Sequence, residues 1–149
     1  MRIASSCGIP RDASSIAAAL SGMFQYGSYV LFVDPFFDPF KQKYSTTLRE
    51  CLRIAKAKNP TAEYEIHHRY HESKPSQAEI EEEASKQFRG VIPEGMTLKI
   101  YCWRQKSGGA HFHAPYLLTD RGGISVDAGF SAEGDHQCTD MHLMDLEFC

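Results

Sequence analysis

The sequence contains no long apolar run. No stretch approaches the roughly 18 consecutive apolar residues that a membrane-spanning helix needs. The N-terminus also lacks a positively charged segment followed by an apolar core, which marks a secretory signal. We therefore expect a cytoplasmic protein with no membrane span.

Cysteine patterning is equally sparse. The chain has five cysteines, an odd number, and none of them forms a Cys-x-x-Cys pair. This favours a reducing compartment, and we expect no disulfides. The formal net charge of -3 argues against a broad, non-specific coat of nucleic acid, but it leaves room for a local basic groove.

Several well-known site motifs are missing as well. The glycine pairs 108–109 and 122–123 precede expected strands rather than helix N-termini, so they do not form phosphate loops. No motif supports a Ser-His-Asp or Cys-His nucleophile. His136-x-Cys138-x3-His142 offers nitrogen and sulfur ligands, but its spacing matches no usual zinc pattern. We predict neither a metal site nor a cofactor.

Length and composition fit one globular domain. The 149 residues are 42% hydrophobic and 23% charged, which is ordinary for a folded domain with its own core. We predict a single domain over residues 1–149, with no repeat or low-complexity segment. Residues 1–10 are small and polar, and we expect them to be either a flexible terminus or the cut end of a longer protein.

Periodicity predicts alternating helices and strands. Residues 28–33 form a nearly continuous apolar run, which is typical of a central strand buried on both faces. N-cap residues and helical spacing predict three helices, and alternation predicts the remaining strands, with an antiparallel later half of the sheet. The expected fold class is α/β, with a mixed β-sheet flanked by helices. The expected helices begin near residues 12, 41 and 76, and the other expected strands cover residues 63–70, 96–103 and 140–148.

Residues 110–130 predict a hairpin with an unusual polar pair. Alternation places His111 and His113 on one strand face with Leu117 and Thr119, and the opposite face carries Phe112, Tyr116 and Leu118. We expect Arg121 and the two following glycines to supply the positive φ angles of a tight turn. Ile124, Val126 and Ala128 then give the returning strand an apolar face.

This hairpin resembles the phospholipase D superfamily. His113, Pro115 and Asp120 stand at the spacing of its His-x-Lys-x4-Asp motif, with proline in place of lysine. The chain is also similar to the phospholipase D-like domain at the C-terminus of MIT-containing proteins, where the lysine is likewise replaced. The resemblance covers residues 28–148 and includes Asp34-Pro35-Phe36-Phe37, Ile92-Pro93 and a displaced Gly129-Phe130-Ser131.

The resemblance implies a histidine nucleophile at His113, a supporting Asp120, and a site completed by a second copy of the motif. His111 lies on the same strand face as His113 and joins them as a catalytic candidate. Because one chain supplies one motif, an active enzyme would be a two-fold homodimer. Pro115 provides neither an ammonium group nor an N–H, which suggests an edge strand or a bulge.

Further residues are candidates for holding phosphate. Asp34 follows the central strand, where open α/β sheets place ligands, although an Asx-type turn before Pro35 explains it equally well. His67 belongs to a cluster with His68, Arg69 and His71 that either lines a phosphate site or ends a surface strand. The charge of the missing lysine could come from Arg104, Lys106 or Arg121.

These features support three hypotheses. The first is a catalytically degenerate phospholipase D-like module within a larger system. It binds either a protein partner or a phosphate-bearing ligand, which is a nucleic acid or a lipid head group, with nucleic acid favoured. The second is a homodimeric, metal-independent phosphodiesterase or nuclease that uses His113. The third is a purely structural interaction domain with His111 and His113 buried.

Overall fold

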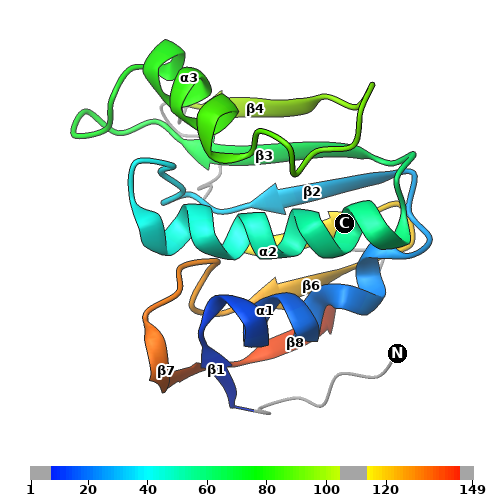
Figure 1. The fold of residues 1–149 in the computed structure, drawn as a ribbon. Coiled ribbons are helices and arrows are strands. Elements are labelled where there is room, and N and C mark those ends of the chain that lie inside the picture. The colour runs from blue at the N-terminus through cyan, green and yellow to red at the C-terminus, as the bar shows by residue number, and fades with distance from the viewer. Residues whose placement is uncertain (1–7, 105–113, 145–149) are drawn as a thin grey trace.

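The computed structural model describes residues 8–104 and 114–144 (Figure 1). The elements are a short strand, three α-helices, one 3₁₀-helix and seven further strands. In chain order they are β1 (Ile9–Arg11), α1 (Ala13–Leu20), η1 (Ser21–Phe24), β2 (Tyr29–Val33), α2 (Gln42–Lys58), β3 (Glu63–Arg69), α3 (Gln77–Gln87), β4 (Leu98–Trp103), β5 (Tyr116–Thr119), β6 (Gly122–Val126), β7 (Gly134–Thr139) and β8 (Met141–Met144).

Six strands form one mixed sheet in the order β4-β3-β2-β5-β6-β8. Strands β2, β3 and β4 run parallel, whereas β5, β6 and β8 each run antiparallel to their neighbours. The predicted α/β class with a mixed sheet is confirmed, as are the interior position of β2 and the antiparallel later half. A separate two-stranded sheet pairs β1 with β7.

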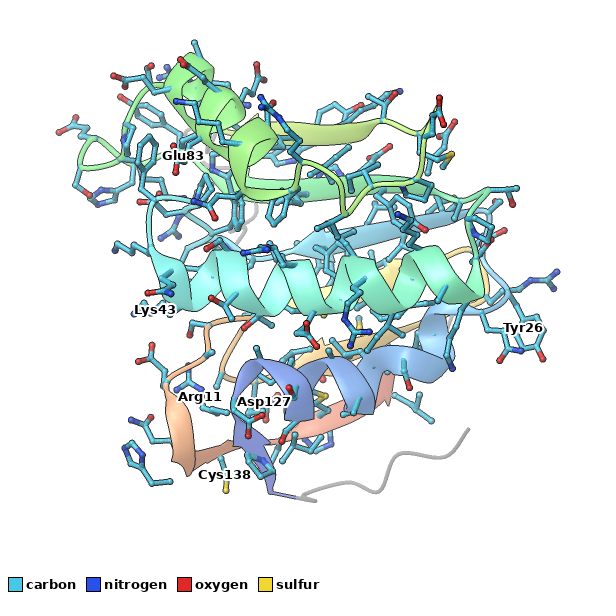
Figure 2. All side chains as sticks on the ribbon, in the orientation of Figure 1. Arg11, Tyr26, Lys43, Glu83, Asp127 and Cys138 are labelled. Carbon is cyan, nitrogen blue, oxygen red and sulfur yellow. The ribbon has the colours of Figure 1, made fainter. Side chains whose placement is uncertain are left out.

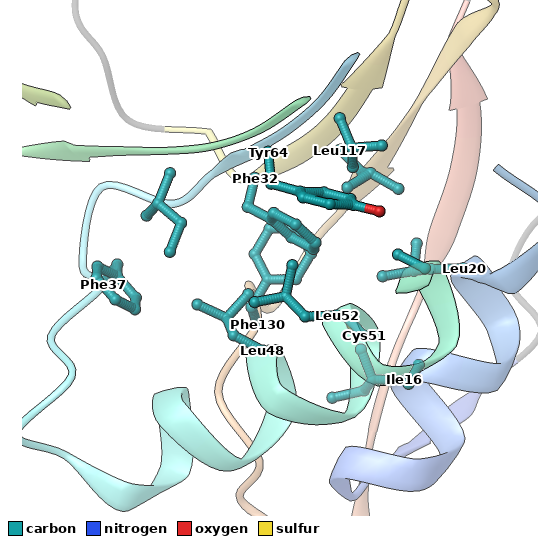
Figure 3. Packing of buried hydrophobic residues seen from close by; sticks show 14 of the residues in the cluster. Ile16, Leu20, Phe32, Phe37, Leu48, Cys51, Leu52, Tyr64, Leu117 and Phe130 are labelled. Atoms are coloured by element: carbon teal, nitrogen blue, oxygen red, sulfur yellow. The ribbon is translucent and has the colours of Figure 1, made fainter. Parts of the chain in front are cut away.

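All three α-helices lie on the same face of the sheet (Figure 1). The residues that face them are apolar at every second position, including Val30 and Phe32 of β2, and Tyr64 and Ile66 of β3. Figure 3 shows Phe32, Tyr64, Leu48 and Leu52 gathered between sheet and helix. The opposite sheet face carries no helix in the described part of the chain.

Local chemistry explains where two of the helices begin. Asp12 caps α1, because its carboxylate accepts a hydrogen bond from the backbone N–H of Ser15 at 2.8 Å. Ser76 and Glu79 form a reciprocal capping box at the start of α3. The three predicted helices are confirmed. Within the described residues, none of the helices combines the length and apolar character that a membrane span requires.

The hairpin differs from its prediction in where the turn lies. Thr119 pairs with Gly122, so the loop consists of Asp120 and Arg121, and Gly122 with φ of 154° already belongs to β6. The Thr119 hydroxyl closes this turn by accepting from the Arg121 N–H and donating to the Gly122 carbonyl. The two glycines are therefore strand residues. The predicted common face of Leu117 and Thr119 is confirmed, and both residues are buried.

The ring of Pro115 had suggested an edge strand or a bulge. In the structure, Pro115 lies just before an interior strand. Strand β5 is bonded to β2 on one side and β6 on the other. Because proline has no N–H to donate, the regular ladder starts at Tyr116, while the Pro115 carbonyl still accepts from Val126 N–H at 3.1 Å.

Both ends of the chain contribute strands that the sequence did not predict as such. Ile9 and Pro10 belong to the segment that we expected to be a flexible or cut terminus, but they lie in β1 and pair with β7. Strand β7 itself was not predicted. The predicted closing strand is confirmed only over Met141–Met144, since residues 145–148 lie outside the described residues.

Replacing the cap of α3 should measurably weaken the fold. We expect Ser76→Ala to lower the free energy of unfolding by about 1 kcal/mol, because it removes the capping box. Urea titration followed by circular dichroism measures this. The matched control is Ser85→Ala in the same helix, where Ser85 only donates to the Glu81 carbonyl. That variant should be neutral or slightly stabilised, and an equal loss in both variants would contradict the role of the cap.

Candidate functional site

The carboxyl ends of β2, β3 and β4 meet at one edge of the sheet, on the left in Figure 1. Open α/β sheets bind ligands at this edge, because loops and unpaired backbone groups converge there. We call it the carboxyl edge and define it by the polar residues at the carboxyl ends of these strands and in the loops that follow them: Asp34, His68, Arg69, Lys74 and Arg104.

Asp34 is buried at the carboxyl edge, with 3% of its surface exposed. One carboxylate oxygen accepts from the Phe36 N–H at 3.0 Å, which is the Asx-type turn that the sequence suggested. The other accepts from the Phe130 N–H at 2.9 Å. Burial raises the pKa of Asp34, against the opposing influence of these two hydrogen bonds and of Lys74 and Arg11. Both oxygens are thus engaged in holding two loops together.

The loop that approaches Asp34 includes the Gly129-Phe130-Ser131 segment singled out in the sequence. Gly129 has φ of 77°, and a Cβ there would lie 3.0 Å from an Asp34 oxygen and 3.5 Å from Pro115. The Ser131 hydroxyl binds Arg11 Nη2 at 2.6 Å. The structure therefore brings together three of the segments on which the resemblance to the phospholipase D superfamily depends, at Asp34, Pro115 and Ser131.

Arg11 and Lys43 hold this loop from outside. Both contact Glu133, Lys43 at 2.9 Å and Arg11 at 3.8 Å. Figure 2 shows Arg11 on β1 and Lys43 near the start of α2, on the same side of the molecule. Their positive charges are paired with Glu133 of this loop.

Lys74 is a half-buried cation that the sequence analysis missed. Its ammonium group donates to the Pro35 carbonyl at 2.9 Å and the Arg69 carbonyl at 2.8 Å, and it faces His68 Nδ1 at 3.3 Å. Desolvation lowers the pKa of Lys74 to about 8, so the protonated form still dominates at neutral pH. With three N–H groups and three acceptors, Lys74 has no donor left for a ligand. Only its place before Pro75 in a polar loop hinted at this role.

His68 is fully buried beside Lys74. Its Nε2 lies 3.0 Å from the Gln77 amide oxygen, whose nitrogen donates to Glu81 and to the Ile100 carbonyl. The network therefore assigns the proton to Nε2 and leaves Nδ1 to accept from Lys74. Desolvation, with the Lys74 charge, lowers the pKa of His68 to about 4. His68 is neutral, and both of its nitrogens are engaged.

Two clefts flank Lys74 at the carboxyl edge. One, of about 380 Å³, is lined by Phe36, Lys41, Arg69 and His71 among others. The second, of about 520 Å³, is lined by Tyr70, Gln77, Cys102 and Arg104 among others. Each cleft thus has an arginine and an exposed aromatic ring in its wall.

The two arginines differ from the other cations of this edge. The Arg69 guanidinium lies 5.6 Å from the centre of the Phe36 ring, and that of Arg104 lies 3.9 Å from the centre of Tyr70. Among the described residues, neither forms a salt bridge. They are positioned by cation–π contacts, and their N–H donors are not neutralised by a carboxylate.

The other predicted site residues are dispersed. Asp120 and Arg121 lie at the opposite end of β5, where the Asp120 carboxylate accepts from the Ser28 N–H and hydroxyl, each at 2.8 Å. These bonds lower the pKa of Asp120.

His67 lies on the sheet face that no described helix covers, and both of its ring nitrogens are hydrogen-bonded. His111 and His113 lie outside the described residues, as does Lys106. Among the predicted residues that the structure describes, Asp34 and Arg104 lie at the carboxyl edge, and His67 lies beside it, because its carbonyl accepts from the Asp34 N–H at 2.9 Å.

One group of metal-ligand atoms exists among the described residues. Single atoms of Asp127, Asp140 and His142 lie within 4.8 Å of one another, and His142 already faces Asp127 at 3.5 Å. His136 and Cys138, which the sequence placed near His142, are not part of it. Exposed groups of this kind are common without metal, and we assign none here.

Comparisons with known proteins return no relationship: no protein-family model matches the chain, and no curated protein is significantly similar to it. The architecture defines a two-layer α/β domain with a candidate site at the carboxyl edge of its parallel strands.

Asp34→Asn should destabilise the protein strongly for so small a change. An amide offers only one acceptor oxygen, so its NH₂ group would face the N–H of Phe36 or Phe130 inside the protein. We expect a loss of about 1–3 kcal/mol in the free energy of unfolding, measured by urea titration. Asp120→Asn is the matched control, because Asp120 also accepts from two donors but is exposed. Equal losses in both would show that burial of Asp34 does not matter.

His68 should make the protein sensitive to mild acid. Because its folded pKa of about 4 lies below the ordinary value of 6.5, the unfolded chain binds the proton more readily between these pH values. Its stabilising contribution is complete above pH 6.5 and is lost as pH falls toward 4, by about 1–3 kcal/mol in all.

The measurement is the free energy of unfolding of wild type and His68→Gln at pH 7, 6, 5 and 4. The variant should be less stable at neutral pH, and the difference from wild type should shrink as pH falls. His71→Gln, at an exposed histidine of the same region, should follow the wild-type profile. A constant difference for His68→Gln would exclude this titration.

Proposed function

We propose that this protein binds a phosphate-bearing ligand at the carboxyl edge through Arg69 and Arg104, without hydrolysing it. The observation that carries the proposal is that these two guanidinium groups, alone among the cations of this edge whose contacts are described above, are held in place by aromatic rings rather than by carboxylates or carbonyls. A guanidinium group presents a planar fork of donors that matches phosphate oxygens.

The surroundings support anion binding. Arg69 shares its cleft with Lys41 and the exposed His71, and Arg104 lines the neighbouring cleft. The carboxylate in the first cleft, Asp38, is buried and accepts from the Phe40 N–H. A ligand phosphate would therefore meet more cationic than anionic groups, despite the net charge of -3 for the whole chain.

Several features favour binding over turnover. Pro115 stands where the resembling enzymes have the lysine that neutralises phosphate, and the nearby Lys74 has no N–H to spare. His67 and His68 each have both ring nitrogens engaged, so neither is a ready nucleophile or general acid. This supports the interpretation of a degenerate module.

Binding of inorganic pyrophosphate, measured by isothermal titration calorimetry, tests the proposal. We expect Arg69→Ala and Arg104→Ala each to weaken affinity by about 10-fold or more, because each removes charge-assisted hydrogen bonds. Arg121→Ala is the matched control, since Arg121 is an exposed arginine at the opposite end of β5. Affinity unchanged in both edge variants, or lost in the control, would refute the assignment.

Turnover is tested separately, with a generic phosphodiester and with single- and double-stranded DNA in the presence of EDTA. We expect no hydrolysis by wild type or by His113→Ala. Hydrolysis by wild type that His113→Ala abolishes would instead establish the homodimeric phosphodiesterase implied by the resemblance.

A further inference from the structure

Three aromatic rings lie together on the sheet face that carries no helix. Tyr64, Ile66 and His68 of β3 face the core, so the intervening His67 points to the other side. In register with it, β4 presents Tyr101 and then Trp103. The His67 ring stacks on Tyr101 with a centroid distance of 4.8 Å, and it lies 5.9 Å from Trp103 at an interplanar angle of 13°. We call these three residues the ring platform.

Hydrogen bonds hold the platform rigid. The Trp103 indole N–H donates to His67 Nδ1 at 2.8 Å. That nitrogen therefore carries no proton, and His67 Nε2 donates to the Glu65 carboxylate at 2.9 Å. A chain from Glu65 through His67 to Trp103 thus orients two of the three rings before any partner arrives, which reduces the entropy lost on binding.

The platform is exposed even though the polar side-chain atoms of His67 and Trp103 are hydrogen-bonded. Trp103 is 50% exposed and Tyr101 is 39% exposed. Because the only polar side-chain atom of Trp103 is bonded to His67, the surface that it presents to water is ring carbon. Covering a rigid apolar ring with a flat partner removes ring carbon from water, which favours binding.

Cations lie near these rings. Lys99 lies on the same face of β4, and Arg69 is paired with Trp103 across the strands. Arg104 follows Trp103 in the chain and lines the adjoining cleft beside Gln77 of α3. The Glu65 carboxylate, in contrast, is bonded to His67. Exposed ring faces beside unpaired guanidinium groups are the arrangement with which proteins hold unpaired bases and their phosphates. A lipid head group has no ring to stack, and a duplex keeps its bases covered.

We infer that the ring platform stacks unpaired bases of a single-stranded nucleic acid whose phosphates bind Arg69 and Arg104. This inference rests on the proposed function and names its ligand class. Trp, Tyr and Arg are also common at protein interfaces. The charge of the surrounding residues favours nucleic acid, and self-association through the platform is an outcome that the test resolves.

Trp103 is the only tryptophan of the chain, so its fluorescence reports directly on the platform. The probes are an oligothymidylate of about ten nucleotides, a DNA duplex of the same length, and heparin, a polyanion without bases. We expect the single strand to quench Trp103 emission and to bind at least about 10-fold tighter than the duplex. Heparin should bind without comparable quenching.

Variants separate stacking from charge. Tyr101→Ala should weaken binding of a dye-labelled oligothymidylate, followed by anisotropy, by about 5- to 150-fold. Tyr101→Phe should retain binding, and inorganic pyrophosphate affinity should be unchanged in both. The matched control is Tyr29→Ala, because Tyr29 is 37% exposed and lies on the same sheet face at the far end of β2. Thermal melting checks that each variant is folded.

The outcomes are distinct. Selective loss of single-strand binding in Tyr101→Ala, with pyrophosphate binding intact, supports the inference. Equal binding of single strand, duplex and heparin, unaffected by Tyr101→Ala, overturns the platform and leaves the phosphate site standing. Absence of binding to every phosphate ligand overturns both. Concentration-dependent association of wild type that Tyr101→Ala abolishes, without nucleic-acid binding, shows a protein interface and overturns the inference.

Discussion

The buried Asp34 carboxylate joins the two halves of this fold. One oxygen closes the turn after β2 and the other holds Phe130, which lies 96 residues further along the chain. The parallel half of the sheet is thereby fastened to the loop that follows the antiparallel hairpin. Phe130 then packs edge-on against Phe32, with ring centroids 5.7 Å apart (Figure 3). Only glycine at position 129 permits the close approach.

Cations at the carboxyl edge divide into two kinds. Lys74 lies half-buried, saturated with acceptors, and connects the loops after β2 and β3. Desolvation, with the Lys74 charge, lowers the pKa of His68 and keeps its ring neutral. Arg69 and Arg104 lie at the rims, oriented by aromatic rings and unpaired with carboxylates among the described residues. The structural charge of Lys74 and the proposed binding charges of Arg69 and Arg104 are thus carried by different residues.

The described helices all lie on one face of the sheet, so none of them covers the other face of β3 and β4 (Figure 1). Side chains alternate along these strands, so every second residue faces the helices and the residues between them point to the uncovered face. Arg69 and Trp103 lie opposite each other where both strands finish. The proposed phosphate site and the proposed stacking surface therefore adjoin, because they share the ends of the same two strands.

The amino-acid sequence by itself determined the elements that depend on neighbours close in the chain. The capping of α1 by Asp12, the Ser76–Glu79 box, the apolar run of β2 and the Asx-type turn at Asp34 each involve residues within a few positions, so periodicity and side-chain chemistry were enough to predict them. Only the tertiary structure decided what these elements meet. Asp34 accepts from Phe130, Asp120 accepts from Ser28, and His67 accepts from Trp103, all between segments that no local pattern pairs. Strand order and register set which distant side chains become neighbours, and they follow from burial of the whole core.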